Sequence, residues 1–351
     1  MQPQPRPRAT RTRALLGAAA TLALAAALAG CGSGGSSAGD AKAALGGHAG
    51  GASGSATPSA AQSSTQPPKP SRILMPTGPA ADLRKARDTA AGPILMTTVT
   101  GAKSGVSGKV WVWLPPQYND PKYAKHGFPV LTLYAGGQSA GYNTWTDNQL
   151  PIEEINAQMA AEGKAHPFIM IMPVQNLDSS EAKALECSDI PGQPKMGTWM
   201  SQDIPDFVRA NFRTVKGRDG WAVMGASTGA FCSAKLALQH PDVFKAAVPI
   251  DGYWNPDSPL WKGHDQERLA NSPDVLVGEG KADVRMLATA GGANAYETKL
   301  VKNWVAKAKA PLTVEYYEQP GGKHLTADFK KMIPTTLEWL TKNTAGPESD
   351  G

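Results

Sequence analysis

The sequence predicts an α/β domain with a mostly parallel central sheet and helices on both faces. Short apolar runs such as PVLTLY (129–134) and FIMIM (168–172) are continuous and bounded by Gly, Pro or polar residues. This pattern is typical of strands that are buried on both faces. Longer helical stretches separate these runs, and strands that alternate with helices indicate a parallel sheet.

The expected elements follow one another along the chain. Strands are expected at residues 93–99, 109–114, 129–134, 168–172, 221–224, 246–250, 284–288 and 312–317, the first two of them antiparallel. Helices are expected near 152–162, 200–213, 228–240, 296–309 and 326–343. In such a sheet, ligands bind at the carboxyl ends of the strands, so functional residues are expected at that edge.

The 351 residues carry a formal charge of +5, which by itself suggests a nucleic-acid partner. The positive charge is concentrated at the N-terminus, because residues 1–72 hold seven Lys and Arg side chains against one Asp. The remaining residues, 73–351, have a formal charge of −1. Nucleic-acid binding therefore loses its electrostatic support, and no nucleic-acid partner is expected.

The N-terminus has the pattern of an export signal. Arginines lead into the apolar run 14–29, which ends in LAGC at Cys31 and then turns polar. The run resembles the lipobox of bacterial lipoproteins, in which the cysteine becomes the new N-terminus and carries the lipid. The resemblance implies a signal peptide over 1–30 and a protein anchored through Cys31 to the outer face of the cell membrane. The alternative is an ordinary secretory signal with a chance cysteine.

Composition divides the rest of the chain. Residues 31–72 are mostly Gly, Ser, Ala, Pro, Thr and Gln, cannot bury enough apolar surface to fold, and are expected to form a disordered tether. Residues 73–345 are expected to form one folded domain, and 346–351 a disordered tail. No stretch beyond the N-terminus is long and apolar enough to span a bilayer. We expect a monomer.

Three serines lie in the pattern Gly-x-Ser-x-Gly, and their context separates them. The chemistry requires a strand, a sharp turn and then a helix. Ser37 lies in the tether, and no helix immediately follows Ser139. Ser227 follows WAVMG and opens a good helix, whose dipole favours developing negative charge. Ser227 is therefore the candidate nucleophile, with a tight structural turn as the alternative.

A serine hydroxyl is a poor nucleophile without a base, and His324 is the candidate base. It lies between the last expected strand and the last expected helix, at the carboxyl edge of the sheet. The order serine, acid, histidine is that of the α/β-hydrolases. Of the other five histidines, only His264, in a polar loop, stays open as an alternative.

The acid is expected in a loop after a strand between Ser227 and His324. Glu297 is the first carboxylate beyond the penultimate strand, where the acid usually lies. Asp251 directly follows the preceding strand and is the competitor. Glu297 is favoured, although it also fits a solvated carboxylate at a helix start.

Two backbone N–H groups are expected to hold the oxyanion of an acyl-transfer reaction. One should belong to Thr228, the residue after the candidate nucleophile. The other should come from the loop after PVLTLY, where glycines let the backbone approach closely. Gly137 is preferred there and Gly136 is the alternate, although these glycines also fit a simple turn.

The assembled pattern resembles the secreted esterase branch of the α/β-hydrolases, which includes esterase D-like enzymes and the mycolyltransferases. The resemblance covers nearly all of 95–343 and rests on FPVLTLYAGG, FIMIMPV, GWAVMGASTGAFCSAKLALQHPDVFKAAVPIDG and GGKHLTADFKKMIPTTLEWL. Two departures stand out. Ala135 and Gln138 replace the residues that contact trehalose in the mycolyltransferases, and Asp251 stands where the family usually has Ser, which keeps it a candidate acid.

The resemblance implies a cell-surface serine esterase or acyltransferase that forms an acyl-enzyme on Ser227. Its substrate would be a small-molecule or cell-envelope ester, and neither a cofactor nor a metal ion is expected. Acyl transfer to a sugar is the alternative to hydrolysis. A non-enzymatic surface-binding lipoprotein on the same scaffold is the alternative from a different class.

The three cysteines exclude a disulfide-rich scaffold and a four-cysteine zinc site. With Cys31 assigned to a lipid, Cys187 and Cys232 remain, and an exported protein meets oxidising conditions. We expect a Cys187–Cys232 disulfide that pins the loop 174–198 beside the helix after Ser227. Two free thiols are the alternative.

Several aromatic side chains fall in expected loops. They are Tyr142, Trp145, Trp199, Tyr253, Trp254 and Trp261. They are expected either to line an acyl or sugar cleft or to pack in the core.

Overall fold

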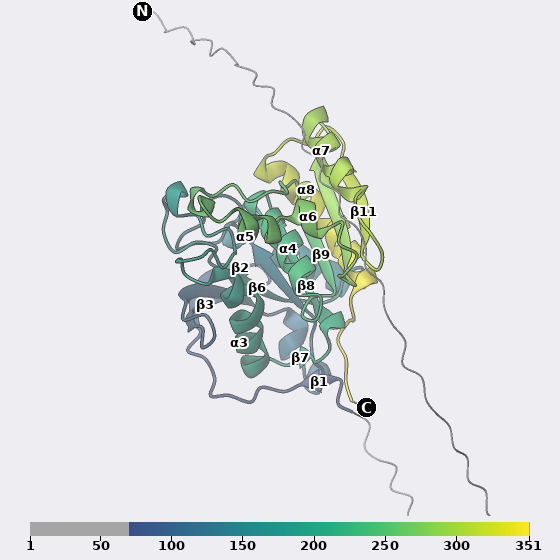
Figure 1. Ribbon diagram of the computed structural model, residues 1–351. Helices are drawn as coiled ribbons and strands as arrows, with labels where there is room; N and C mark the ends of the chain where they lie inside the picture. Colours follow the sequence, from purple (N-terminus) through teal and green to yellow (C-terminus); the bar gives the residue numbers. More distant parts are fainter. Residues whose placement is uncertain (1–69, 351) are drawn as a thin grey trace, which may run out of the picture. The chain divides into compact units, whose positions relative to one another are not determined.

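The computed structural model describes residues 70–350 (Figure 1). The predicted signal peptide, the predicted lipid site at Cys31 and the tether up to residue 69 lie outside the described residues. The described part is organised around a nine-stranded sheet. No helix within residues 70–350 is long and apolar enough to cross a membrane.

Six neighbouring strands of the sheet are parallel, and the other three are antiparallel. The parallel strands are, in spatial order, β6 (Ile169–Pro173), β5 (Val130–Tyr134), β8 (Trp221–Ala226), β9 (Ala246–Ile250), β10 (Arg285–Gly291) and β11 (Thr313–Gln319). Beyond β6 follow the antiparallel strands β4 (Ser107–Trp113), β3 (Gly92–Thr100) and β2 (Arg84–Thr89). The chain turns from one side of β5 to the other between β6 and β8, which creates a switch point where ligands bind.

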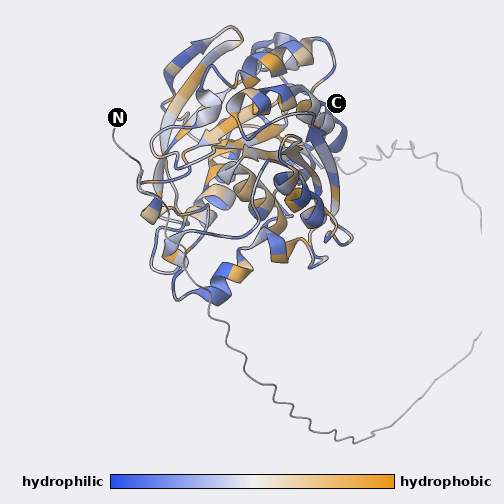
Figure 2. Ribbon diagram, turned by 90° about the horizontal axis from the view of Figure 1, so that it is seen from above, coloured by the Kyte–Doolittle hydropathy of each residue, from blue (hydrophilic) through white to orange (hydrophobic). Residues whose placement is uncertain are grey.

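The burial of the central strands explains their apolar sequences. Every residue of β5, β6, β8 and β9 is buried. Figure 2 shows these apolar strands inside a layer of helices and loops with mixed hydropathy. Strands covered on both faces need no alternation of polar and apolar residues, so continuous runs such as VLTLY result.

Helices cover both faces of the sheet. The longer ones are α1 (Ile152–Ala161), α3 (Ile204–Asn211), α4 (Thr228–Gln239), α7 (Ala295–Val305) and α8 (Thr326–Asn343), and the shorter ones are α2 (Met196–Thr198), α5 (Asp265–Ala270) and α6 (Pro273–Leu276). A Cβ at Gly225 of β8 would overlap Gly229 of α4, so this face of β8 points to α4. Thr289 of β10 contacts Met332 of α8. The strand register places Thr289 on the opposite face from Gly225, so α4 and α8 lie in different layers.

The predicted fold class is confirmed, and the predicted strands and longer helices are all present within a few residues. The strand β2 escaped the sequence analysis because its sequence, RKARDT, is charged and has no apolar face. It lies at the edge of the sheet, where charged side chains protect against pairing with another chain. A small second sheet, β1 (Ile73–Leu74) with β7 (Thr214–Val215), also lacked a sequence signal.

The prediction of a disordered tail over 346–351 is wrong for the described residues 346–350. Glu348 forms an antiparallel bridge with Gly127, with N–H···O distances of 2.8 and 3.0 Å. The Asp350 carboxylate accepts hydrogen bonds from the Ser71 hydroxyl (2.6 Å) and the Arg72 amide (2.7 Å). The tail is polar, so composition indicated disorder, but Glu348 pairs with the segment before β5 and Asp350 with the first described residues of the domain.

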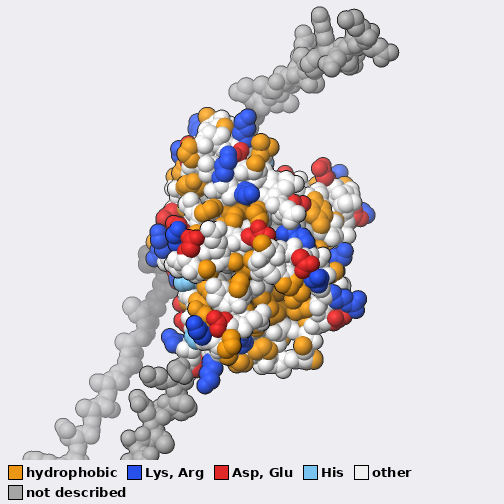
Figure 3. Space-filling view, turned by 180° about the vertical axis from the view of Figure 1, so that it is seen from behind, with side chains coloured by type: hydrophobic (Ala, Val, Ile, Leu, Met, Phe, Trp, Pro, Cys, Tyr) orange, Lys and Arg blue, Asp and Glu red, His pale blue; other side chains and the backbone are white. Residues whose placement is uncertain are grey.

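The surface of the domain carries both signs of charge. On the face seen in Figure 3, Lys and Arg side chains are interspersed with Asp and Glu side chains. Ion pairs such as Arg218–Asp283 (2.9 Å) join the two signs directly. This mixture agrees with the formal charge near zero of the part of the chain after the tether.

Candidate active site

Ser227 lies in the sharp connection between β8 and α4. Its backbone has φ 58° and ψ −118°, a conformation that non-glycine residues rarely adopt. The Ser227 amide donates to the Ile250 carbonyl at 2.9 Å, which fixes the turn against β9. A Cβ at Gly229 would overlap the carbonyl of Tyr134, and one at Gly225 would overlap Gly229. Both glycines of the Gly-x-Ser-x-Gly pattern are therefore needed for the strand and helix to approach so closely.

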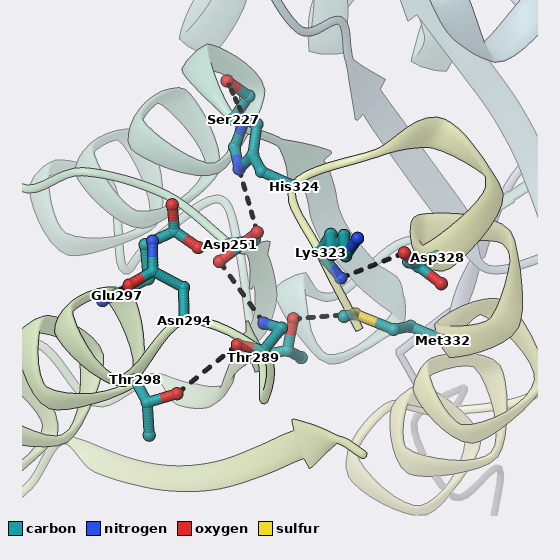
Figure 4. A network of polar contacts seen from close by, with 11 residues as sticks. Ser227, Asp251, Thr289, Asn294, Glu297, Thr298, Lys323, His324, Asp328 and Met332 are labelled. Atoms are coloured by element: carbon teal, nitrogen blue, oxygen red, sulfur yellow. Dashed lines mark hydrogen bonds and ion pairs between the residues drawn. The ribbon is translucent and has the colours of Figure 1, made fainter. Parts of the chain in front are cut away.

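His324 lies in the loop between β11 and α8 and faces the Ser227 hydroxyl. The distance from Nε2 to Ser227 Oγ is 3.0 Å, and the distance from Nδ1 to Asp251 Oδ2 is 2.9 Å (Figure 4). A carboxylate can only accept, so Nδ1 carries the proton, and the Nε2 lone pair is left for the serine hydroxyl. The hydrogen bond to Asp251 is the main cause that raises the pKa of His324.

Asp251 follows β9 directly and is almost fully buried. Its side chain is 2% exposed, while that of His324 is 43% exposed. Its backbone has a positive φ of 51°, and its amide donates to the Thr289 carbonyl at 3.0 Å. The other carboxylate oxygen accepts a long hydrogen bond of 3.4 Å from the Gly291 amide. These contacts aim one oxygen at the imidazole and hold the other against β10.

The structure gives the place beside His324 to Asp251, which corrects the preference for Glu297. Glu297 lies in the first turn of α7 and is partly exposed. Its charge also raises the pKa of His324, but it is the smallest of the causes that act on this pKa. The reason lies in the strand order. The strand β9 is the immediate neighbour of β8, so its carboxyl end lies next to Ser227, whereas β10 is one strand further away. The last residue of β10, Gly291, leaves no room for a side chain, since a Cβ there would lie 2.7 Å from the Gly322 carbonyl in the His324 loop.

The two predicted oxyanion donors, Thr228 and Gly137, line the same cavity. Thr228 begins α4, where the first amides of a helix have no partner inside the helix. Gly137 has a positive φ of 64°, and neither its amide nor that of Thr228 donates to an acceptor in the described part of the chain. Gly136, the alternate, lies against Ser227, but its amide is directed at the Thr144 hydroxyl at 3.4 Å. Gly137 therefore stays the preferred candidate of the two, and its role remains a prediction.

Ser139, which matches the same pattern, has a structural place. Its side chain is fully buried, and its hydroxyl donates to the Gly136 carbonyl at 2.7 Å. It thus supports the loop that carries Gly137 and is closed to substrate. Ser37 lies outside the described residues.

A cavity of about 500 Å³ opens beside the candidate nucleophile. Gly137 and Thr228 form part of its wall, and the rest includes Gln138, Asn176, Glu181, Ala182, Ala184, Glu186, Tyr253, Asp257, Ser258 and Pro259. Of the aromatic residues that were expected to line a cleft or pack the core, Tyr253 lines this cavity. Trp145, Trp199, Trp254 and Trp261 are buried and belong to the core. Within residues 70–350, no three His, Cys, Asp or Glu side chains are grouped as metal ligands.

The predicted disulfide between Cys187 and Cys232 is present. The two Cα atoms lie 5.8 Å apart, which suits the bond. Cys232 lies on α4, so the bond ties the long segment after β6 to the helix that begins beside Ser227. Glu186, which precedes Cys187 and lines the cavity, carried no sequence signal of its own, because its partners are distant in the chain.

Comparison with known proteins decides the family. The family model described as "Putative esterase" matches residues 102–340, more than half of the chain. The chain belongs to this esterase family. The match contains Ser227, Asp251 and His324 together.

Solved structures share the fold of this esterase-family protein. A ferulic acid esterase has a TM-score of 0.58 at 17% identity, and the match covers 71% of this chain and 97% of that one. An S-formylglutathione hydrolase from Agrobacterium tumefaciens has a TM-score of 0.57 at 14% identity, covering 75% and 99%. An uncharacterized protein of Corynebacterium glutamicum is 21% identical over 220 residues, which is 63% of this chain. This chain matches half the length of that relative.

Proposed function

We propose that this esterase-family protein is a serine carboxylic-ester hydrolase that works through an acyl-enzyme on Ser227. The observation that carries the proposal is the continuous hydrogen-bonded row from Ser227 Oγ through His324 to the buried Asp251 carboxylate. This arrangement of nucleophile, base and orienting acid is the one that activates a serine hydroxyl for acyl transfer. Family membership over 102–340 supports the same activity.

In the first half of the reaction, Ser227 Oγ attacks the ester carbonyl carbon while its proton moves to His324 Nε2. The negative charge that develops on the carbonyl oxygen is held by the Thr228 and Gly137 amides. Asp251 keeps the proton on Nδ1 and stabilises the imidazolium that forms. The carbon–oxygen bond to the alcohol then breaks, and His324 returns the proton to the leaving oxygen.

In the second half, water attacks the acyl-enzyme. His324 takes one proton from the water, and the water oxygen bonds to the acyl carbon. The bond between the acyl carbon and Ser227 Oγ then breaks. The proton returns to the serine, and the carboxylic acid leaves. The 43% exposure of the His324 side chain gives water access to this step.

The test is the hydrolysis of p-nitrophenyl acetate by the wild-type protein and by Ser227→Ala. We expect Ser227→Ala to lose at least about 10³-fold in kcat, because oxyanion and binding contacts alone retain little catalysis, and to keep its melting temperature. Full residual activity would refute the assignment. Acyl chain-length series, a feruloyl ester, and trehalose or glucose as acceptor then define the substrate and separate hydrolysis from transfer.

We further propose that the protein is exported and anchored to the outer face of the cell membrane through a lipid on Cys31. The LAGC sequence at the end of the apolar run supports this location. Cys31→Ser should move the protein from the membrane fraction to the medium. A variant that stays in the membrane fraction contradicts the lipid anchor.

A further inference from the structure

Glu186 is a buried carboxylate for which the proposed reaction has no use. It is 2% exposed and has a positive φ of 47°. Its oxygens accept hydrogen bonds from Trp261 Nε1 (2.7 Å), the Asp257 amide (2.9 Å) and the Tyr253 hydroxyl (3.4 Å). All three donors belong to the loop that follows β9 and Asp251. A buried carboxylate with this many partners fixes the loop that surrounds it.

The helix α4 holds the backbone segment that carries this carboxylate. Cys187, the next residue, is bonded to Cys232 of α4. The buried Lys235 of α4 donates from Nζ to the Cys187 carbonyl (2.5 Å) and to the Ser188 hydroxyl (2.6 Å). Thr228, Cys232 and Lys235 are spaced by four and three residues, so they share one face of the helix. The Glu186 segment is therefore fastened along the face of α4 that begins at Thr228.

Tyr253 joins Glu186 to the first turn of α4. Its ring stacks on Phe231 of α4, with centroids 5.1 Å apart and planes at 11°. Its hydroxyl donates to Glu186 at 3.4 Å, and burial is the main cause that raises the pKa of this hydroxyl. Glu186, Tyr253 and Thr228 all line the cavity beside Ser227.

We propose that Glu186, acting through Tyr253, is a positioning residue for the Thr228 amide, and the inference rests on the proposed function of Ser227 and Thr228. An oxyanion donor is effective only when it is held in place before the reaction begins. The Glu186 carboxylate orients the Tyr253 hydroxyl, and Tyr253 packs against the turn that presents the amide. Neither residue touches the reacting atoms.

The test is a double-mutant cycle on kcat with Glu186→Gln, Tyr253→Phe and the double variant. Each single variant should lower kcat about tenfold with KM within about twofold, because the contact acts on the transition state and not on substrate binding. The double variant should also lose only about tenfold, because both residues act along one route. Tyr118→Phe is the matched control. The Tyr118 hydroxyl accepts a hydrogen bond from the Arg213 amide (3.0 Å). Tyr118 precedes β5 and Arg213 precedes β8, so this contact lies at the amino ends of the parallel strands, opposite Ser227.

Two results overturn the proposal: wild-type kcat in Tyr253→Phe, or single losses that multiply in the double variant. Glu186→Gln leaves one buried donor without an acceptor and can lower stability, so Tyr253→Phe, which keeps the ring stack, carries the test alone if needed. Melting curves check that each variant is folded. Ser227→Ala in the same assay separates the two levels: activity in Ser227→Ala refutes the proposed function, whereas an inactive Ser227→Ala beside an unaffected Tyr253→Phe refutes only the role of Glu186.

Discussion

Asp251 shows how much of the site depends on a single residue at the end of a strand. It is buried, its backbone is in the left-handed region, and one carboxylate oxygen faces His324 Nδ1. Such a carboxylate fixes the tautomer of the imidazole and stabilises its charged form. Gly252 must follow it, because a Cβ there would lie 2.6 Å from the Ala230 Cβ of α4.

Asp251→Asn and Glu297→Gln provide a matched comparison of the two candidate acids. We expect Asp251→Asn to lower kcat for p-nitrophenyl acetate by about 10³- to 10⁴-fold, because the amide no longer selects the productive tautomer. Glu297→Gln should stay within about threefold, since Glu297 acts on His324 only through its charge. A larger loss in Glu297→Gln would restore the assignment that the sequence favoured.

The pH dependence of kcat/KM should follow His324. A base must be neutral, and the hydrogen bond to Asp251 raises the pKa of His324, so activity should fall as the pH drops through that raised value. Asp251→Asn removes the main cause, and the acid midpoint of its residual activity should move to lower pH. Rate profiles of both proteins measure the shift. An unchanged or higher midpoint in the variant would show that Asp251 does not set the protonation of His324.

At the residue scale, local sequence patterns were sufficient to predict that Ser227 and His324 lie together, and insufficient to predict the carboxylate that contacts His324. A strand, a turn and a helix in immediate succession identify Ser227, and the last strand and helix enclose His324. The acid depends on which strand lies next to β8, and that order is a long-range property of the sheet. The contact between Glu186 and Tyr253 was hidden for the same reason, because the two residues are 67 positions apart in the chain.

The connection between β8 and α4 is the element whose geometry is least tolerant of change. Gly229→Ala should lower the free energy of unfolding by about 1–3 kcal/mol, because its Cβ overlaps the Tyr134 carbonyl, and should abolish measurable ester turnover. Gly217→Ala is the control, since its φ is −73° and the nearest atom to a new Cβ is 3.9 Å away. Urea unfolding curves and the ester assay compare the two variants. A Gly229→Ala protein with wild-type stability would show that the strand and helix are less tightly packed than described.

The disulfide should stabilise the domain as a whole. It joins residues 45 positions apart, and a loop of that length corresponds to about 4 kcal/mol in the chain-entropy account. We expect the double variant Cys187→Ala/Cys232→Ala to unfold at lower urea concentration than the wild type. Reductant should lower the midpoint of the wild type and leave that of the double variant unchanged. Equal midpoints for the two oxidised proteins would mean that the bond contributes nothing to stability.

At the element scale, the elements with continuous apolar runs or amphipathic patterns were predictable. The buried strands β5, β6, β8 and β9 have such runs, and the helix α8 has its apolar residues on one face. The strand β2 was not predictable, because its charged and mostly exposed side chains give no pattern of buried apolar residues. It exists because its backbone pairs with β3.

At the scale of the whole molecule, composition misjudged the end of the chain, and the predicted tether lies outside the described residues up to residue 69. The first described residues join the domain where the tether was expected to stop, with β1 at Ile73–Leu74. The polar residues 346–350 were misjudged, because hydrogen bonds between backbone groups, such as those of Glu348 and Gly127, leave no compositional signal. The order of the strands, and with it the position of Asp251, also belongs to this scale.

The most direct test of the account is to trap the acyl-enzyme. The protein is mixed with p-nitrophenyl acetate, quenched with acid during turnover, digested, and analysed by mass spectrometry, with Ser227→Ala as the control. The account predicts an acetyl group on the peptide that contains Ser227, and none in the variant. Undiminished turnover with no acetyl group on that peptide, or with the group on another residue such as Ser139, would contradict it.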